Sequence, residues 1–301
     1  MLVAVAVIAL GLPHGVLAQQ ALEPEQRMAA LINQARIAQG LSALSLSPEL
    51  TTAAQLHARD MAAKGYMEHE NLAGLTPQQR AAKQGYVAPA GTAWLVLEVI
   101  TARATAEAGL NWLLSDRQHR GVVLRGYWRE FGIGFAEGGP WGQIWSVKFG
   151  CRPNVLPVVP EPNANGGQLL RFTNEECSPG GGIGQIGRAT EVMVSSRNDF
   201  EGAAWEPYAS TRAVQDGSNV FVKLRDAKGR EVVQTSGNGV SLSTLTTSDG
   251  PLNPALLTGT AAPVETSAPS GGATPATSPA QPSILNSDAS SNFIIGGDAG
   301  R

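Results

Sequence analysis

Residues that start helices and residues that end them alternate with short apolar runs between positions 24 and 150, and this alternation limits what the segment can fold into. Ser47 and Thr76 are each followed directly by proline, which joins an N-cap hydroxyl to a residue suited to the first helical position. Glycines stand where the helical patterns stop, and glycine readily adopts the left-handed backbone that closes a helix. We expect four helices: one ending before Gly40, one from Pro48 to Lys64, one between Pro77 and Gly85, and one beginning near Thr105.

Three apolar runs alternate with these helices and are typical of strands. They are residues 93–101 (AWLVLEVIT), 131–136 (FGIGFA) and 142–150 (GQIWSVKFG). Helices on both sides of a small sheet make a layered α/β fold. The sequence therefore predicts one α/β unit over residues 24–150.

The composition changes after Cys151. Residues 151–167 are rich in proline and glycine, which predicts a linker. Residues 168–247 predict a small all-β, sandwich-like module, because the stretch NVFVKLRDAKGREVV alternates inward and outward residues on either side of a turn. From residue 250 to 301 the chain consists mainly of Ala, Thr, Ser, Pro and Gly with almost no charge, which predicts a disordered tail.

The first 18 residues predict export. The apolar run from Leu2 to Leu12 is too short to span a bilayer comfortably, and it is followed by Gly-Leu-Pro and by a small-residue cleavage pattern ending at Ala18. We expect a signal peptide over residues 1–18 and a secreted, extracellular protein, with an uncleaved anchor helix as the alternative. No other apolar stretch approaches 18 residues, so no transmembrane segment is expected after signal removal.

Charge and cysteine content bear on partners and compartment. The formal net charge is −3, and no concentrated basic face is visible, which argues against nucleic acid as a partner. The cysteines are Cys151 and Cys177. In an exported chain two cysteines predict one disulfide, which would contribute roughly 3 kcal/mol of stability, and two free buried thiols are the alternative.

Histidine is scarce, which narrows where chemistry could take place. After the first 18 residues the histidines are His57, His69 and His119, and all three lie in the α/β unit. His57 shares a helical face with apolar residues at spacings of three and four, which favours a core histidine bonded to backbone. His69 lies in a loop between two glutamates, where it is either solvated or part of a site.

Glu98 is the one charged residue in the run AWLVLEVI. Both faces of that strand are otherwise apolar, so its carboxylate should be largely desolvated whichever face is buried. An unpaired buried carboxylate costs several kcal/mol or takes up a proton. We therefore expect a partner for Glu98: a histidine, an arginine or a metal ion. A purely structural pairing with an arginine or with backbone remains the alternative.

His119 follows the fourth predicted helix, and Asp116 lies three residues before it and could orient its ring. If the helix continued, Trp112, Ser115 and His119 would share one face. A catalytic triad of Ser115, His119 and Asp116 is not favoured, because the three residues would crowd one turn without a nucleophile elbow or an oxyanion loop.

The order of these elements resembles a known family. The stretches LINQARIAQGLSALSLSPEL, GYMEHEN, LEVI and NWLLSDRQHRGVVLRGYWREFGIGFA are similar to the CAP superfamily of cysteine-rich secretory, antigen 5 and pathogenesis-related 1 proteins, in its bacterial SCP-like extracellular branch, over about residues 25–150. The resemblance implies an α-β-α sandwich (the CAP fold) with a central cleft, where two histidines and one or two acidic side chains can hold zinc. By position, His69, Glu98 and His119 correspond to this metal set.

The chain departs from the family pattern at two points. The Gly-Glu-Asn element reads Leu97-Glu98-Val99, and the second acidic position falls on Ser115. Two histidines and one glutamate would still form a three-ligand set with an open position.

Three functions follow from the resemblance. The first is a non-catalytic or weakly catalytic binding module whose cleft holds a metal ion, with zinc as the cofactor, and a small apolar or cell-envelope ligand. The second is a metal-assisted hydrolase in which His69 and His119 are ligands and Glu98 is a ligand or the general base. The third is a structural adhesion protein in which the β module and the tail act and the cleft is vestigial. It rests on the stretch AAWEPYASTRAVQDGSNVFVKLRDAKG within residues 168–247, which is reminiscent of Ig-like or fibronectin-like modules.

Overall fold

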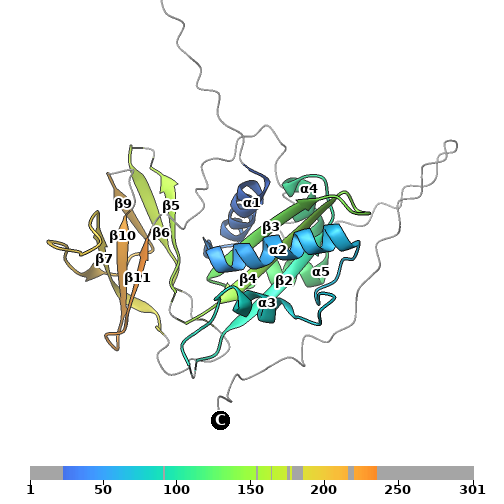
Figure 1. Cartoon of the computed structure of the whole chain (residues 1–301). Helices are drawn as coiled ribbons and strands as arrows, with labels where there is room; N and C mark the ends of the chain where they lie inside the picture. The colour runs from blue at the N-terminus through green and yellow to red at the C-terminus, as the bar shows by residue number, and fades with distance from the viewer. Residues whose placement is uncertain are drawn as a thin grey trace, which may run out of the picture.

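The structure is a computed structural model, and it describes residues 23–90, 92–153, 155–163, 165–174, 177, 186–215 and 220–235. The predicted signal peptide (1–18) and the predicted tail (250–301) lie outside the described residues. The described elements form an α/β unit followed by a β unit (Figure 1). Among the described residues, no helix is both long and apolar enough to cross a membrane.

The α/β unit contains five helices and four strands among its described residues. The helices are α1 (Pro24–Ala38), α2 (Pro48–Lys64), α3 (Pro77–Lys83), α4 (Ala106–Ser115) and α5 (Arg117–Val123). The strands are β1 (Ser45–Leu46), β2 (Leu95–Thr101), β3 (Glu130–Glu137) and β4 (Gln143–Cys151).

The predicted helix ends are confirmed by their capping contacts. The Ser47 hydroxyl accepts a hydrogen bond from the Leu50 amide, and Thr76 forms a reciprocal capping box with Gln79. α2 ends at Gly65, whose φ of 67° lies in the left-handed region. These local signals therefore set where α2 and α3 begin and where α2 ends.

The helix predicted from Thr105, α4, ends at Ser115 and does not continue to His119. Asp116 has extended backbone, and its carboxylate accepts hydrogen bonds from the amides of Gln118 and His119. Asp116 therefore ends α4 and caps the separate helix α5, because an aspartate that satisfies free amides favours a new helix start over continuation. This break changes where His119 points.

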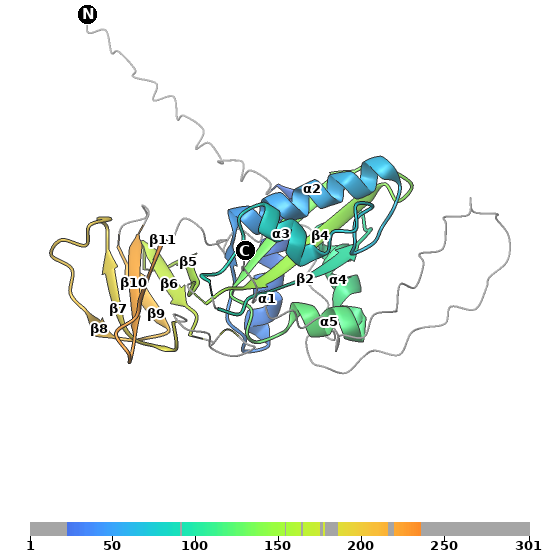
Figure 2. The same cartoon turned by 60° about the horizontal axis from the view of Figure 1, so that its bottom comes forward.

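The strands of the α/β unit form one sheet in the order β1-β3-β4-β2, in which β1 is parallel to β3 and the other pairs are antiparallel. One large apolar cluster packs α1 and α4 against one face of the sheet. Two smaller clusters lie on the opposite face, beneath α2 and α3. Figure 2 shows the two helical layers on either side of the sheet, which confirms the α-β-α sandwich.

α2 packs directly on the backbone of β3. A Cβ atom at Gly132 would lie 2.1 Å from the carbonyl carbon of Leu50, and one at Gly134 would lie 2.3 Å from that of Ala54. Only glycine fits at such an approach. The glycines of FGIGFA therefore hold α2 close to the sheet, and with it His57.

The β unit contains two antiparallel sheets, ordered β11-β10-β7-β8 and β5-β6-β9, that share one apolar core. Its strands are β5 (Val158–Pro162), β6 (Gln168–Phe172), β7 (Ala189–Ser195), β8 (Glu206–Pro207), β9 (Thr211–Val214), β10 (Phe221–Asp226) and β11 (Glu231–Thr235). The predicted sandwich-like module is thus confirmed over its described residues, while residues 236–247 lie outside them. One difference is that β5 falls within the predicted linker, 151–167, and pairs with β6.

Residues that follow β4 are fixed to the α/β unit at several points. Cys151 and Cys177 form the predicted disulfide. Arg129 is fully buried, and its guanidinium donates hydrogen bonds to the carbonyls of Pro153 and Val155. The residues that follow the α/β unit therefore complete its interior.

Candidate functional site

Glu98 lies at the centre of β2 on the face covered by α2, and its side chain is fully buried. It sits between the two small apolar clusters of that face, with Val96 in one and Ile100 in the other. In the antiparallel register it is directly opposite Lys148 of β4, which is also fully buried. The sheet thus places two opposite charges side by side inside the protein.

Both carboxylate oxygens of Glu98 are occupied. Oε1 accepts hydrogen bonds from the Lys148 ammonium and, at 2.9 Å, from the Ser146 hydroxyl. Nη2 of Arg80 lies 3.2 Å from Oε1 and 3.0 Å from Oε2. Nδ1 of His69 lies 3.2 Å from Oε2. A carboxylate offers about four lone-pair positions, so these contacts leave none for a further partner.

Arg80 connects this carboxylate to the loop that carries His69. Its Nη1 donates to the carbonyl of His69 at 2.7 Å and to that of Leu75 at 2.5 Å, and the residue is 7% exposed. Arg80 comes from α3, whose capping box fixes the start of the helix. We refer to Glu98, Lys148, Arg80, Ser146, His57 and His69 as the Glu98 cluster.

His57 has the core position predicted from its helical face. It is 1% exposed, and its Nε2 lies 3.0 Å from the carbonyl oxygen of Glu68 and 3.7 Å from Oε2 of Glu98. Burial lowers the pKa of His57 to about 4; Glu98 opposes this shift, and the cations Lys148 and Arg80 reinforce it. His57 is therefore a neutral imidazole at neutral pH.

The charges of the cluster do not balance. Burial alone would raise the pKa of Glu98, but Lys148, His69, His57 and Arg80 hold it well below its ordinary range. Burial lowers the pKa of Lys148 to about 8, against the opposing pull of Glu98. A single anion, Glu98, thus forms ion pairs with two buried cations, Lys148 and Arg80.

His119 has different partners. Its Nδ1 lies 2.7 Å from Oδ1 of Asp116, and its ring lies 4.9 Å from that of Trp112. Asp116 therefore orients the ring of His119, as expected from the sequence. The hydroxyl of Ser115 donates a hydrogen bond to the carbonyl of Trp112 and not to His119. Ser115, His119 and Asp116 therefore form no catalytic triad. Within the described chain, no hydrogen bond or ion pair joins His119 to Glu98 or His69.

The structure therefore brings together two of the three predicted metal ligands, His69 and Glu98. Among the described residues there is no group of three or more His, Cys, Asp and Glu that could hold a metal ion. A cation would have to displace Lys148 or Arg80 from Glu98, and both would repel it. The residues present around Glu98 do not fit a metal centre, and no chemical step is assigned to one.

Sequence reasoning did not identify the two cationic partners of Glu98, Lys148 and Arg80. Lys148 is the one charged residue in the apolar run QIWSVKFG, which is the same signal that singled out Glu98. Pairing the two isolated charges of neighbouring strands would have found it. Arg80 was covered only by the general expectation of an arginine partner, because nothing in LTPQQRAAKQG indicates that this arginine turns inward.

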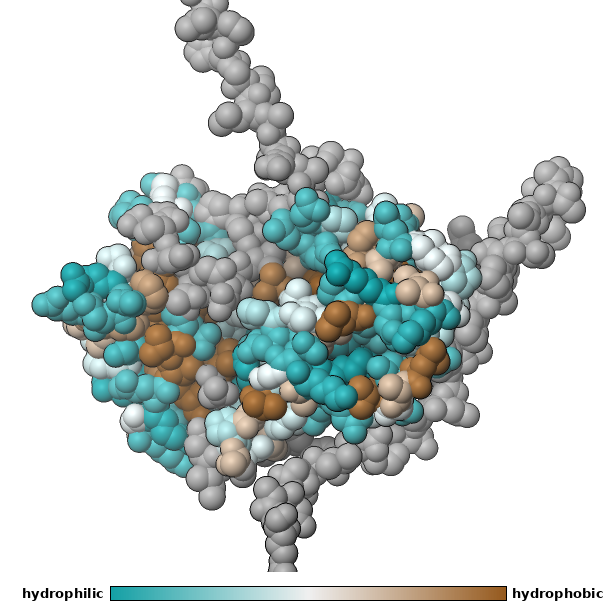
Figure 3. Space-filling view, in the orientation of Figure 1, coloured by the Kyte–Doolittle hydropathy of each residue, from teal (hydrophilic) through white to brown (hydrophobic). Residues whose placement is uncertain are grey.

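The α/β unit has a cavity of about 290 Å³ between α2 and α3. It is lined by Ala53, Leu56, His57, Asp60, Asn71, Leu75, Arg80, Lys83 and Gln84. On the face shown in Figure 3, hydrophobic residues are scattered among hydrophilic ones over the α/β unit. An exposed leucine, Leu56, stands at this cavity and is 51% exposed.

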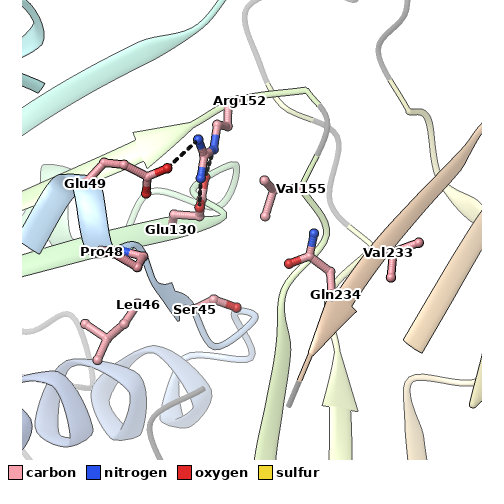
Figure 4. Close-up of a pocket in the computed structure, with 9 residues that line it drawn as sticks. All are labelled: Ser45, Leu46, Pro48, Glu49, Glu130, Arg152, Val155, Val233 and Gln234. Atoms are coloured by element: carbon pink, nitrogen blue, oxygen red, sulfur yellow. Dashed lines mark hydrogen bonds and ion pairs between the residues drawn. The ribbon is translucent and has the colours of Figure 1, made fainter. Parts of the chain in front are cut away.

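A second cavity, of about 360 Å³, lies between the α/β unit and β11 (Figure 4). Arg152 dominates its polar side and forms ion pairs with Glu130 and Glu49. Tyr86 also donates a hydrogen bond to Glu130. The charged groups on this side of the cavity are therefore engaged with one another.

The match to a known protein family covers nearly the same residues as the α/β unit. Residues 29–149 match the sequence model of CAP, the cysteine-rich secretory protein family. No curated protein matches the sequence at a significant level. An outer surface protein from Borrelia burgdorferi matches with 21% identity and a TM-score of 0.38, over 42% of this chain and 91% of that protein. An extracellular protein containing an SCP domain, from Bacillus anthracis, matches with 21% identity and a TM-score of 0.37, over 42% of this chain and 39% of that protein.

Proposed function

Residues 29–149 form a CAP domain, and from this premise we propose that the chain is an exported binding protein that uses no catalytic group in the Glu98 cluster. Its ligand is a small apolar or cell-envelope molecule. The signal-like pattern at residues 1–18 supports export, as does the disulfide between Cys151 and Cys177, since disulfides persist in oxidising compartments.

One observation carries the proposal: the carboxylate of Glu98 is saturated by Lys148, Arg80 and Ser146. A general base needs a free lone pair within reach of the proton it removes, and a metal ligand needs one directed at the ion. Glu98 has neither, because its side chain is fully buried and its acceptor positions are filled. The cluster supports the structure of the cleft and does not carry out chemistry.

The competing function, a metal-assisted hydrolase, requires a different arrangement of the same residues. Lys148 and Arg80 would have to leave Glu98, and His119 would have to turn from Asp116 toward His69. Both movements separate ion pairs that the fold has formed. Zinc binding therefore distinguishes the hydrolase from the proposed binding protein.

The experiment is a zinc titration of the purified full chain by calorimetry at pH 7.5 and pH 5.5, together with assays on casein, peptides and esters. We expect hydrolysis at background and no zinc binding that depends on His69. The variants His69→Ala and His119→Ala serve as a matched pair, because both side chains are partly exposed and neither forms the buried Lys148 pair.

Zinc-dependent turnover that disappears in both variants would overturn the proposal in favour of the hydrolase. Zinc binding without turnover, weaker at pH 5.5 and lost in both variants, would keep the binding role and restore the predicted metal site, because protonated imidazole cannot ligate.

A further inference from the structure

The outer strand of the α/β sheet has a free edge beside the Glu98 cluster. Among the described strands β2 pairs only with β4, because the sheet has the order β1-β3-β4-β2. Helices α3 and α5 contact β2 from the two sides of the sheet (Figure 2), so this edge lies between the two helical layers. The other outer strand, β1, has two residues, whereas β2 has seven and contains no proline. Short strands and prolines are common ways to protect a sheet edge, and β2 has neither.

Two hydrogen bonds show which main-chain groups of β2 face this edge. The carbonyl of Gly150 in β4 accepts from the N–H of Arg129, on the β3 side, so Gly150 faces away from its partner in β2, Val96. The N–H of Val96 also faces away from β4, since it donates to Oε1 of Gln78 in α3. Main-chain direction alternates along a strand, so the second and fourth residues after Val96 face the edge as well.

These two residues, Glu98 and Ile100, present two N–H groups and two carbonyls at the edge. In the described part of the chain, none of the four groups has a hydrogen-bond partner. Exposure follows the same alternation, because Glu98 and Ile100 are 6% and 8% exposed, whereas Val99 and Thr101, which face β4, are 1% and 0% exposed. The side chain of Glu98 is fully buried, so its exposed surface belongs to the main chain.

The pattern of these groups indicates what kind of ligand fits them. Donors and acceptors that repeat every second residue match the main chain of another extended polypeptide, as when a strand is added to a sheet edge. A charge on an edge strand usually opposes such addition. Glu98 does not, because its carboxylate is already buried and paired with Lys148 and Arg80, so covering the edge removes no charge from water.

The chain itself contains a segment with the composition of such a strand. Residues 250–301 consist mainly of Ala, Thr, Ser, Pro and Gly, yet residues 292–296 read NFIIG. Phe293 is the only aromatic residue after Phe221, and it is followed by the β-branched Ile294 and Ile295. Aromatic and β-branched residues favour strands. These residues lie outside the described part of the chain.

The segment is long enough in its connection to reach the edge. Roughly 60 residues separate Phe293 from Thr235, the last residue of β11. A flexible chain of that length has a root-mean-square span of roughly 40 Å. A folded body of about 200 residues has a radius of gyration of about 16 Å. Covalent linkage would therefore present the segment to the edge at an effective concentration on the order of 1 mM.

We propose that the free edge of β2 is a strand-acceptor site and that residues 293–295 of the same chain bind there as an added antiparallel strand. The proposal goes beyond the small-ligand role given above and does not rest on it. Zinc binding and hydrolysis do not report on it.

One alignment of the added strand matches the apolar surroundings of β2. Pairing Ile295 with Glu98 and Phe293 with Ile100 places the side chain of Phe293 on the face of Ile100. Ile100 belongs to the apolar cluster against which the partly buried Tyr66 packs. The aromatic residue of the segment would thus meet an apolar surface.

The test is amide hydrogen exchange of the ¹⁵N-labelled full chain, followed by NMR. The amides of Val99 and Thr101 face β4 whether or not the edge is covered, so their slow exchange reports an intact sheet. The amides of Glu98 and Ile100 are protected only when a strand covers the edge. At an effective concentration on the order of 1 mM, an affinity of about 0.1 mM would slow their exchange about tenfold.

Matched variants identify the occupant. Ile295→Pro removes an N–H that the added strand needs and keeps the length of the chain, and Ile284→Pro makes the same change outside the segment. We expect Ile295→Pro to lose the roughly tenfold protection, Ile284→Pro to keep it, and a synthetic peptide of residues 289–297 at about 1 mM to restore it in Ile295→Pro.

Three results would overturn the proposal. The first is equal exchange of the Glu98 and Ile100 amides in wild type and Ile295→Pro. The second is failure of the peptide to restore protection. The third is protection that persists in Ile295→Pro and increases with protein concentration, which would assign the edge to a second copy of the chain.

Discussion

Replacing Glu98 with glutamine should destabilise the protein far more than the loss of a single hydrogen bond. Glutamine keeps the size of the side chain but removes the charge that neutralises Lys148, which is fully buried. Removing one partner of a buried ion pair typically costs roughly 3–5 kcal/mol, because the other charge is left uncompensated. That loss is a large share of the 5–15 kcal/mol that stabilises a typical domain.

The pKa of Lys148 sets a limit on the loss. Lysine has a pKa of about 10.4 in an unfolded chain, so keeping Lys148 neutral at pH 7.5 costs about 4 kcal/mol at 1.36 kcal/mol per unit. Burial already brings the pKa of Lys148 to about 8 in the presence of Glu98, and the Glu98→Gln variant would lower it further. In the variant, Lys148 can lose its proton, so an uncompensated Lys148 charge cannot lower the free energy of unfolding by more than about 4 kcal/mol. This limit agrees with the loss expected for a broken buried ion pair.

The assay is urea unfolding at pH 7.5, followed by the fluorescence of the buried residues Trp128 and Trp145 of the α/β unit. Lys148→Met provides the second edge of a double-mutant cycle, since methionine fills a similar space without charge. We expect the double variant to be more stable than the sum of the single losses predicts, with a coupling of roughly 1–3 kcal/mol. A loss below about 1 kcal/mol for Glu98→Gln, or strictly additive losses, would refute the assignment of Glu98 as the counter-ion of Lys148.

Three further predictions concern other parts of the fold. His57 has a pKa of about 4 in the folded protein and about 6.5 in the unfolded chain, so the unfolded chain binds a proton more readily. The free energy of unfolding should therefore fall by about 3 kcal/mol as the pH drops between these values. His57→Gln should reduce this pH dependence in urea titrations, and an unchanged dependence would contradict the assignment. Replacing Cys151 and Cys177 together with serine should cost roughly 3 kcal/mol in denaturant melts, and equal stability of reduced and oxidised wild type would argue against this. Gly132→Ala should prevent stable folding because of the backbone of α2, whereas Gly121→Ala, with nothing within 4 Å, should raise the melting temperature slightly; similar effects of the two would disprove the close approach.

The sequence was sufficient to predict the layers of the α/β unit and the burial of Glu98. Caps such as Ser47 and Thr76 act within four residues, so their effect can be read locally. The need for a partner to Glu98 followed from the desolvation of a single carboxylate. Its identity depended on the register between β2 and β4, which pairs Glu98 with Lys148 across 50 residues of sequence. No local pattern encodes that register.

The position of His119 shows how a small local choice redirects a site prediction. Asp116 can either continue a helix or cap a new one, and the balance depends on competing hydrogen bonds to nearby amides. In the structure it caps α5 and also binds the ring of His119. The residue expected only to orient His119 therefore determines its environment, and the meeting of His119 with Glu98 stays a prediction.

Composition alone misjudged the extent of the linker. Residues 151–167 contain several prolines, which weaken a strand prediction, yet Val158–Pro162 form β5. β5 is an edge strand of its sheet, where proline is tolerated because one side of the strand needs no ladder partner. A proline-rich stretch can thus be a linker or an edge strand, and the difference lies in the strands that it meets.

The hydrogen bonds of Arg129 have a consequence for the order of events during synthesis. The guanidinium is enclosed in the CAP domain, but acceptors for it are supplied by Pro153 and Val155, and Cys177 lies further along the chain. A nascent chain that has emerged only to residue 150 lacks these groups, so its interior would hold a cation without those acceptors. The domain can therefore reach its final stability only after the residues that follow β4 have been synthesised. A chain truncated at residue 149, where the match to the family ends, would retain the sequence of the domain but not its completed interior.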